Sequence, residues 1–250
     1  MVFAKGNLQY QASTKTWRFA EQQYECIGEG NANISATYDG WIDLFGFATS
    51  GWNNGNLYYQ PYNTEVCGCN SCGYNYGPTD GNNAYDIDLT GDYANADWGV
   101  YNAIVNGGNK PGLWRCLSEE EMKYLINDRP NAKAYRFQVT IDDITGLIIL
   151  PDNWTAPAGC PEDMTQLTMA QWTTLEDAGA VFLPAAGMRK DTAIWSLNNI
   201  GYYWTSTAIG GFIPDAAYAL SFTISSGTIS YQGRPTRYYG CGVRLVREVE

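Results

Sequence analysis

Three cysteines, Cys67, Cys69 and Cys72, lie in the stretch VCGCNSCGYNYG and are the most conspicuous residues that could do chemistry. Their thiolates could bind a soft cation such as zinc if a fourth ligand came from elsewhere in the chain. The spacing is not that of a paired zinc motif, so a local disulfide and free loop thiols fit it as well. The chain contains seven cysteines, an odd number, which excludes a complete set of disulfides within it. The candidates for a fourth zinc ligand are Cys26, Cys116 and Cys160.

Paired carboxylates, Asp86/Asp88 and Asp142/Asp143, are a second group of reactive residues. Such pairs can act as acid and base or bind calcium, and solvated turns have the same pattern. The stretch DIDLTGD lacks the full twelve-residue calcium loop. The chain has no histidine, which excludes Ser-His and Cys-His nucleophile activation and histidine-ligated metals. The sequence thus leaves a structural zinc or calcium ion open as cofactor and supplies a complete ligand set for neither.

The charge of the chain and its lack of long apolar stretches bear on which partners to expect. Its formal net charge is −11, and nucleic-acid binding needs a basic surface. No stretch is long enough to cross a bilayer, and no signal peptide begins at Met1. We therefore expect no nucleic-acid partner and no membrane insertion. The length of 250 residues suits one domain.

Two helices are expected, because two apolar segments begin with a capping box. In 117–128, Ser118 and Glu121 form the box; in 167–180, Thr168 and Gln171 form it and Gly179 ends the helix. Strands are expected at 2–20, as two strands joined by a polar turn, and at 134–141, 146–151 and 180–184. The last fifty residues should form a meander with a hairpin at Ser226-Gly227.

Residues 40–112 form a long Gly-, Asn- and Tyr-rich stretch without periodicity. Disordered segments are poor in aromatic residues, so we expect this stretch to be ordered by aromatic side chains packed into the domain. The aromatic residues expected to do this are Trp41, Phe45, Phe47, Trp52, Trp98 and Tyr101.

The segment 216–225 alternates strictly between large apolar and small residues. Alternate residues of a strand lie on opposite faces of a sheet. One face should therefore lie in the core, and the other should carry small side chains outward, either as a binding surface or as an ordinary exposed face. Ile229 of the next strand should point inward, and Thr228 and Ser230 outward. The core face comprises Tyr218, Leu220, Phe222 and Ile224, and the outward face comprises Ala217, Ala219, Ser221 and Thr223.

Five segments in this order, LWRCLSEEEMKYLI, VFLPAAGMR, GYYWTSTA, AYALSF and RYYGCGVRLVRE, resemble the C-type-lectin-like fold. They are most similar to its bacterial branch, the major-paralogue domains of gut Bacteroidetes and Fibrobacter. The resemblance covers 114–250 and the N-terminal strands. It implies one α+β domain over 1–250, with two helices, small twisted antiparallel sheets and long irregular loops. Residues 40–112 would be an insertion, and 201–250 a C-terminal sheet with a variable binding face.

Three relatives of this fold suggest functions. Formylglycine-generating enzymes need two cysteines near the C-terminus, where this chain has Cys241 alone, and calcium-dependent lectins carry Glu-Pro-Asn or Gln-Pro-Asp with Trp-Asn-Asp, which it lacks. Variable proteins of diversity-generating retroelements mutate codons at template adenines, and randomised Asn codons cannot yield Glu, Lys, Gln, Met or Trp. Residues 208–231 contain none of these five.

The resemblance to the variable proteins of diversity-generating retroelements implies a fixed scaffold and a variable ligand-binding face. The scaffold residues would include Trp204, Tyr218, Leu220, Phe222 and Arg244. The ligand-binding residues would be Ile209, Phe212, Ile213, Asp215, Ala219, Ser221, Thr223, Ser230, Tyr231, Arg234 and Tyr238.

We therefore expect a non-enzymatic recognition protein, displayed on a phage or bacterial surface, that binds a protein or glycan receptor through its C-terminal face. The alternative is a carbohydrate-binding or adhesin module of a Bacteroidetes surface protein, with Trp52 and Trp98 as sugar platforms. A formylglycine-generating type of enzyme is the third and least supported expectation.

Overall fold

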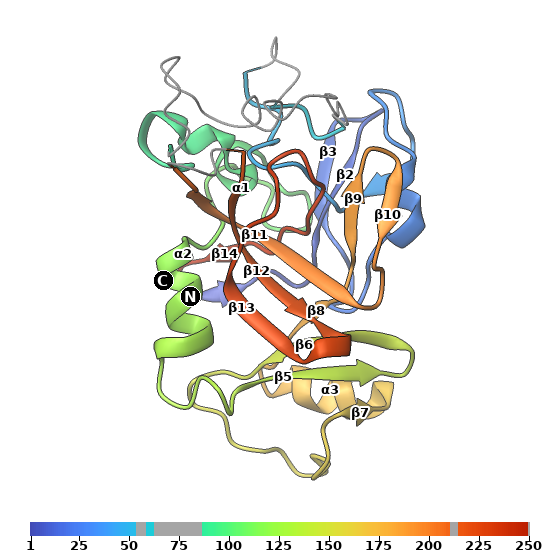
Figure 1. The fold of residues 1–250 in the computed structure, drawn as a ribbon, viewed down its shortest axis with the longest axis vertical. Coiled ribbons are helices and arrows are strands. Elements are labelled where there is room, and N and C mark those ends of the chain that lie inside the picture. Colours follow the sequence, from blue (N-terminus) through green and yellow to red (C-terminus); the bar gives the residue numbers. More distant parts are fainter. Residues whose placement is uncertain (54–58, 63–86, 211–214, 250) are drawn as a thin grey trace.

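The computed structural model describes residues 1–53, 59–62, 87–210 and 215–249 (Figure 1). The fold is mixed α+β, with a few short helices and several small sheets. None of the helices in these ranges is long and apolar enough to cross a membrane.

The two ends of the chain meet in a small sheet. Strand β1 (Val2–Phe3) pairs antiparallel with β14 (Val246–Arg247), with Val2 opposite Arg247. The adjacent three-stranded sheet has the order β3-β2-β4 and contains β2 (Leu8–Gln11), β3 (Thr16–Phe19) and β4 (Trp41–Ile42). The expected N-terminal pair of strands with a polar turn is thereby confirmed. The meander expected in the last fifty residues does not extend to β14, because the segment 240–246 before and within it forms isolated bridges to Phe45, Arg115, Arg189 and Tyr203.

A four-stranded sheet has the order β7-β5-β6-β8 and packs against helix α3 (Met169–Asp177). All its strand pairs are antiparallel except β5 with β7. The three strands expected in this region are confirmed, and β7 is an addition. The strands are β5 (Arg136–Ile141), β6 (Ile144–Ile149), β7 (Gln166–Leu167) and β8 (Val181–Pro184).

The C-terminal sheet consists of β11 (Ile200–Ala208), β12 (Ala217–Thr223) and β13 (Thr228–Gly233), paired antiparallel in that order. The predicted hairpin is confirmed: one 3-10 turn, η6 (Ile224–Ser226), leads into Gly227, whose φ of 69° is a left-handed value that suits glycine. A separate hairpin pairs β9 (Met188–Lys190) with β10 (Ala193–Trp195).

Both predicted helices begin at the predicted capping boxes. Helix α2 (Glu119–Lys123) continues with π-helical hydrogen bonding as η5 (Tyr124–Asp128). The Ser118 hydroxyl accepts from the Glu121 N–H (3.2 Å), and the Glu121 carboxylate accepts from the Ser118 N–H (2.8 Å). Thr168 and Gln171 form the same box on α3. Further short helices are η1 (Gly28–Ala32), η4 (Gly91–Ala96) and α1 (Trp98–Tyr101).

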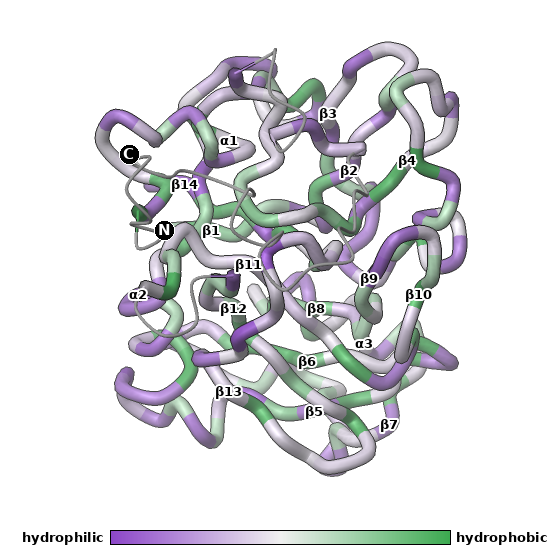
Figure 2. Tube along the Cα trace, turned by 45° about the horizontal axis from the view of Figure 1, so that its top comes forward, coloured by the Kyte–Doolittle hydropathy of each residue, from purple (hydrophilic) through white to green (hydrophobic). Residues whose placement is uncertain are grey.

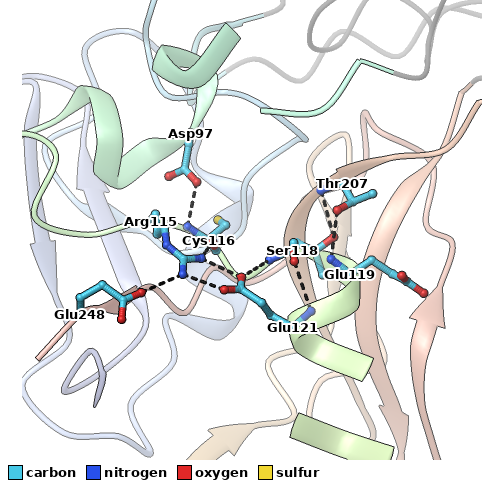
Figure 3. A network of polar contacts seen from close by, with 9 residues as sticks. Asp97, Arg115, Cys116, Ser118, Glu119, Glu121, Thr207 and Glu248 are labelled. Atoms are coloured by element: carbon cyan, nitrogen blue, oxygen red, sulfur yellow. Dashed lines mark hydrogen bonds and ion pairs between the residues drawn. The ribbon is translucent and has the colours of Figure 1, made fainter. Parts of the chain in front are cut away.

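A polar network joins the start of α2 to the C-terminal segment (Figure 3). Both terminal nitrogens of Arg115 bond to the Glu121 carboxylate at 2.7 Å, and one of them also bonds to Glu248 at 3.0 Å. Burial alone would raise the pKa of Glu121, but hydrogen bonds from Arg115 and Ser118 outweigh burial and lower it. This stability contribution is present above the ordinary carboxyl pKa and is lost as the pH falls through the lowered value.

In the described parts of the stretch 40–112, namely 40–53, 59–62 and 87–112, aromatic side chains pack into the domain as expected. Phe45, Phe47 and Trp98 are fully buried in the largest core cluster, beside Trp204. Tyr101 does not contribute in this way, because 39% of its surface is exposed at the end of the four-residue helix α1. Figure 2 shows hydrophobic stretches in strands of several of the small sheets.

Candidate functional site

The side chains of the candidate site lie on a supporting backbone, called the frame below, that consists of the β9–β10 hairpin and the segment 236–240. Arg189 of β9 and Gly240 exchange two main-chain hydrogen bonds of 2.8 Å. The Arg189 side chain is buried and donates to the Leu44 carbonyl at 3.0 Å. This hairpin lies at the right-hand edge of Figure 1.

A second buried arginine, Arg237, fixes the other side of the frame. Its Nε donates to the Ala216 carbonyl (3.0 Å), and its guanidinium lies 5.3 Å from the ring centroid of Phe47. Its main-chain N–H donates to the Asp215 carbonyl (2.7 Å), and its carbonyl accepts from the Phe47 N–H (2.7 Å). The segment before β12 is thereby held against the segment 236–240, so side chains on both have a rigid support.

Six side chains on this frame form what we call the aromatic patch. Tyr238 and Tyr239 contact edge to face, with ring centroids 4.8 Å apart. The Lys190 ammonium lies 5.9 Å from the Tyr239 ring and 5.7 Å from the Trp195 ring, and 50% of the Trp195 surface is exposed. The members are Lys190, Asp191, Trp195, Asp215, Tyr238 and Tyr239.

The surroundings of Tyr238 in the patch raise the pKa of its hydroxyl. Burial raises its pKa to about 12, and a hydrogen bond with Tyr239 and the carboxylates of Asp215 and Asp191 add to the rise. Like any tyrosine, Tyr238 is neutral at pH 7 and its hydroxyl can donate and accept a hydrogen bond; the raised pKa extends this neutral form to more alkaline pH. Flat rings, hydroxyls, one ammonium and two carboxylates can stack on and hydrogen-bond a ligand.

Three predicted residues, Ser221, Thr223 and Ser230, form a separate hydroxyl strip near the β12–β13 turn. Ser221 lies opposite Ser230 in the ladder and Thr223 opposite Thr228, and all three predicted residues are half-buried. Thr228 is exposed, as expected. Ile229 packs, as expected, against a second core cluster, which contains Tyr203, Leu220 and Phe222 among other residues. The strip shares the sheet with the core residues Leu220 and Phe222 but carries no aromatic or charged group of its own.

The expectation that Ala217 and Ala219 face outward is wrong, because Ala217 too is fully buried in the largest core cluster. Ala219 is fully buried, because it lies opposite Trp204 on β11 and both belong to the largest core cluster. The N-terminal half of β12 is therefore covered on both faces. Ile209 is also buried, with 6% of its surface exposed, and its N–H donates to the Ala216 carbonyl at 3.4 Å.

Two further side chains, Tyr231 and Tyr218, differ from the expected arrangement. Tyr231 is half-buried and packs against the second core cluster, so it points to the side of the sheet opposite Ser230. Tyr218, expected in the core, is half-buried, and the exposed Arg234 lies 5.8 Å from its ring centroid. Leu220, Phe222 and Arg244 are buried, as expected of scaffold residues.

Some predicted residues lie outside the described ranges, namely Phe212, Ile213, Cys67, Cys69 and Cys72. Within those ranges no group of three His, Cys, Asp or Glu side chains could hold a metal ion. Cys26, Cys116 and Cys160 are present as free thiols, and Cys116 is buried. The zinc site therefore stays a prediction, because Cys67, Cys69 and Cys72 lie outside the described residues, and the calcium site stays a prediction as well.

The sequence analysis missed four members of the aromatic patch, namely Lys190, Asp191, Trp195 and Tyr239. The sequence did contain one signal for them. Lys190-Asp191 begins a polar turn, and Trp195 follows this turn within a short apolar segment, which is typical of a surface hairpin. No local sequence pattern predicts that this hairpin pairs with Gly240, because the two segments are about fifty residues apart. Comparisons of the chain with protein-family models, curated proteins and solved structures found no match.

Proposed function

We propose that the protein is a non-enzymatic recognition protein that binds a protein or glycan receptor through the aromatic patch. The observation that carries the proposal is a group of exposed and half-buried rings and charges on a backbone held by two buried arginines. Tyrosine and tryptophan supply large contact area at a low cost in conformational entropy. Asp215 and Tyr238, both expected in the ligand-binding face, lie in this patch.

The finer assignment is a C-type-lectin-like variable protein of a diversity-generating retroelement, displayed on a phage or bacterial surface. Two capped helices, several small sheets and long irregular connections support it, since the resemblance implies this composition. The residue types in 208–231 support the retroelement assignment. Against a formylglycine-generating activity, Cys241 is fully buried, and burial raises its pKa well above the ordinary value.

Sequencing of this gene in its native population tests the proposal. We expect substitutions to gather between 208 and 239, in adenine-derived codons, and to favour exposed or half-buried positions such as Asp215, Ser221 and Tyr238. Buried Ala219 and Ile209 should vary less. The exposed turn residues Asp142 and Asp143 provide a matched control, because they are accessible but lie outside the expected region. Even variation along the gene would contradict diversification.

A fixed glycan-binding module is the second candidate, and exposed Trp195 favours it because an accessible indole can stack on a sugar ring. Its site differs from the expected one: Trp98 is fully buried and cannot act as a platform. Trp52 is half-buried, with its ring packed against Tyr59 and Tyr93. A glycan array should lose signal with Trp195→Ala and keep it with Tyr124→Ala, a control at another exposed aromatic residue. Unchanged signal with Trp195→Ala would exclude the patch as the glycan site.

A further inference from the structure

A pocket of about 830 Å³ lies between the N-terminal strand, the helix formed by α2 and η5, and the adjoining ends of β6 and β8. Pockets that hold ligands have volumes of roughly 300–1,000 Å³. Figure 2 shows β1 near α2, and in Figure 1 the N-terminus and β14 lie next to α2. The pocket is distinct from the aromatic patch, since the residues that line it include no member of that patch.

The walls of the pocket are mainly apolar. Ile149 and Leu150 are buried at its base, and Phe3, Leu125 and Val181 line its sides half-buried. The described residues expose seven large hydrophobic side chains, and three of them line this pocket: Met1, Val2 and Tyr124. Concentrated apolar exposure on a soluble surface marks an interaction site more often than scattered exposure does.

One wall is the edge of a strand. Within the described residues β1 pairs only with β14, while β14 also forms a bridge with Arg115 on its other side. The outer edge of β1 is therefore unpaired, and Val2 and Phe3 of this strand line the pocket. An unpaired strand edge can accept the main chain of an extended peptide, and a neighbouring apolar pocket can then take alternate side chains.

The rim of the pocket is acidic. Glu120, Glu121, Asp152 and Glu176 line it, against Lys5 and Arg129. Both cations have partners: Lys5 pairs with Glu21 at 3.3 Å, and Arg129 pairs with Asp152 at 2.7 Å. Two further carboxylates of the rim also have cationic neighbours, because Glu121 pairs with Arg115 at 2.7 Å and Glu120 lies 3.9 Å from Lys123. Among the side chains that line the pocket, carboxylates still outnumber cations by four to two, so the rim carries a net negative charge. A basic partner complements this rim, whereas a second copy of this chain would bring an acidic rim against an acidic rim.

We propose that this pocket binds an extended peptide segment of a partner protein. The segment pairs its main chain with the free edge of β1, places an apolar side chain among Val2, Tyr124 and Leu125, and carries lysine or arginine beside that side chain. The proposal is independent of receptor binding at the aromatic patch.

Selection of peptides on the immobilised full chain tests this inference. The probe is a phage-displayed library of random nine-residue peptides. We expect enriched peptides with apolar residues at alternate positions and lysine or arginine between them. A labelled synthetic copy should bind at least tenfold more weakly to Tyr124→Ala and to Glu120→Lys, and equally well to Trp195→Ala. Both pocket positions are exposed, so neither change should disturb the fold. Hydrogen exchange at Phe3 should slow when the peptide is added.

Several results would overturn the proposal. Enrichment of acidic peptides, or binding that survives both pocket variants, would show that the peptide does not use this site. Failure to enrich any peptide over the Tyr124→Ala protein would do the same. Octylamine binding that depends on Tyr124, without peptide enrichment, would assign the pocket to a small amphipathic cation. A dimer in sedimentation velocity that Tyr124→Ala dissociates would assign it to a second copy.

Discussion

The aromatic patch and the hydroxyl strip both contain residues expected to bind a ligand, but they differ in what they offer one. The patch presents large rings and charged groups, with Trp195 half-exposed. The strip presents the short side chains of Ser221, Thr223 and Ser230, each half-buried in a hydrogen-bonded sheet. Aromatic residues bury about 150–250 Å² each, and serine is under-represented among residues that dominate binding energy.

The two regions also differ in how they are supported. The strip lies on a regular ladder, where main-chain hydrogen bonds between neighbouring strands fix each position. The patch lies on a short hairpin, β9–β10, and on the segments around Asp215 and 236–240, which Arg189 and Arg237 hold together through side chains that reach carbonyl groups far away in the sequence. The patch therefore depends on single side chains beneath it, whereas the strip does not.

The largest expected effect separates these two kinds of support. Arg237→Met should lower the free energy of unfolding by roughly 3 kcal/mol, because the Ala216 carbonyl loses the shorter of its two hydrogen bonds, keeping the 3.4 Å bond from Ile209, and the contact with Phe47 changes. Arg234→Met is the matched control: this arginine is exposed, and its replacement should change stability by less than about 0.5 kcal/mol. Urea unfolding of both variants measures the difference. Equal effects would mean that Arg237 does not hold the frame.

A second prediction concerns the strand that leads into the strip. Ala219→Leu should destabilise the protein by about 2 kcal/mol, because the added volume meets Trp204 in a filled core. Thr223→Leu, at a half-buried position of the same strand, should cost less than about 1 kcal/mol. Thermal unfolding compares the two. If both substitutions were tolerated equally, the N-terminal half of β12 would not be covered on both faces.

These two variants also indicate what the sequence could and could not predict. The capping boxes at Ser118 and Thr168 depend on residues three positions apart, so local sequence was sufficient to find them. The alternation in β12 identified Leu220 and Phe222 as core residues, but the covering of Ala219 depends on Trp204 from another strand. The patch depends on the bridge between Arg189 and Gly240, which no pattern along the chain encodes.

A third prediction compares the patch with the strip directly. Trp195→Ala should weaken receptor binding by at least tenfold, about 1.4 kcal/mol, while Ser221→Ala should change it by less than twofold. Both variants should remain folded, because the Trp195 side chain is half-exposed and Ser221 makes one weak side-chain hydrogen bond of 3.5 Å. Flow cytometry with the labelled protein on native host cells measures the binding. A dominant effect of Ser221→Ala would move the site from the patch to the strip.

The smallest expected effect is on how stability changes at alkaline pH. The aromatic patch contains a group that titrates there, Tyr238, whereas the hydroxyl strip contains none. The pKa of Tyr238 in the folded protein is raised to about 12 from an ordinary value of 10, chiefly by burial. Its contribution to stability is therefore fully present below pH 10 and is lost as the pH rises through about 12, because the unfolded chain releases its proton first. The hydroxyls of the strip make no such contribution. Tyr238→Phe should reduce the loss of stability between pH 10 and 12, whereas Ser221→Ala should leave that loss unchanged. Urea unfolding at several pH values in this window measures both slopes, and an unaltered slope for Tyr238→Phe would mean that the Tyr238 hydroxyl is not shielded in the patch.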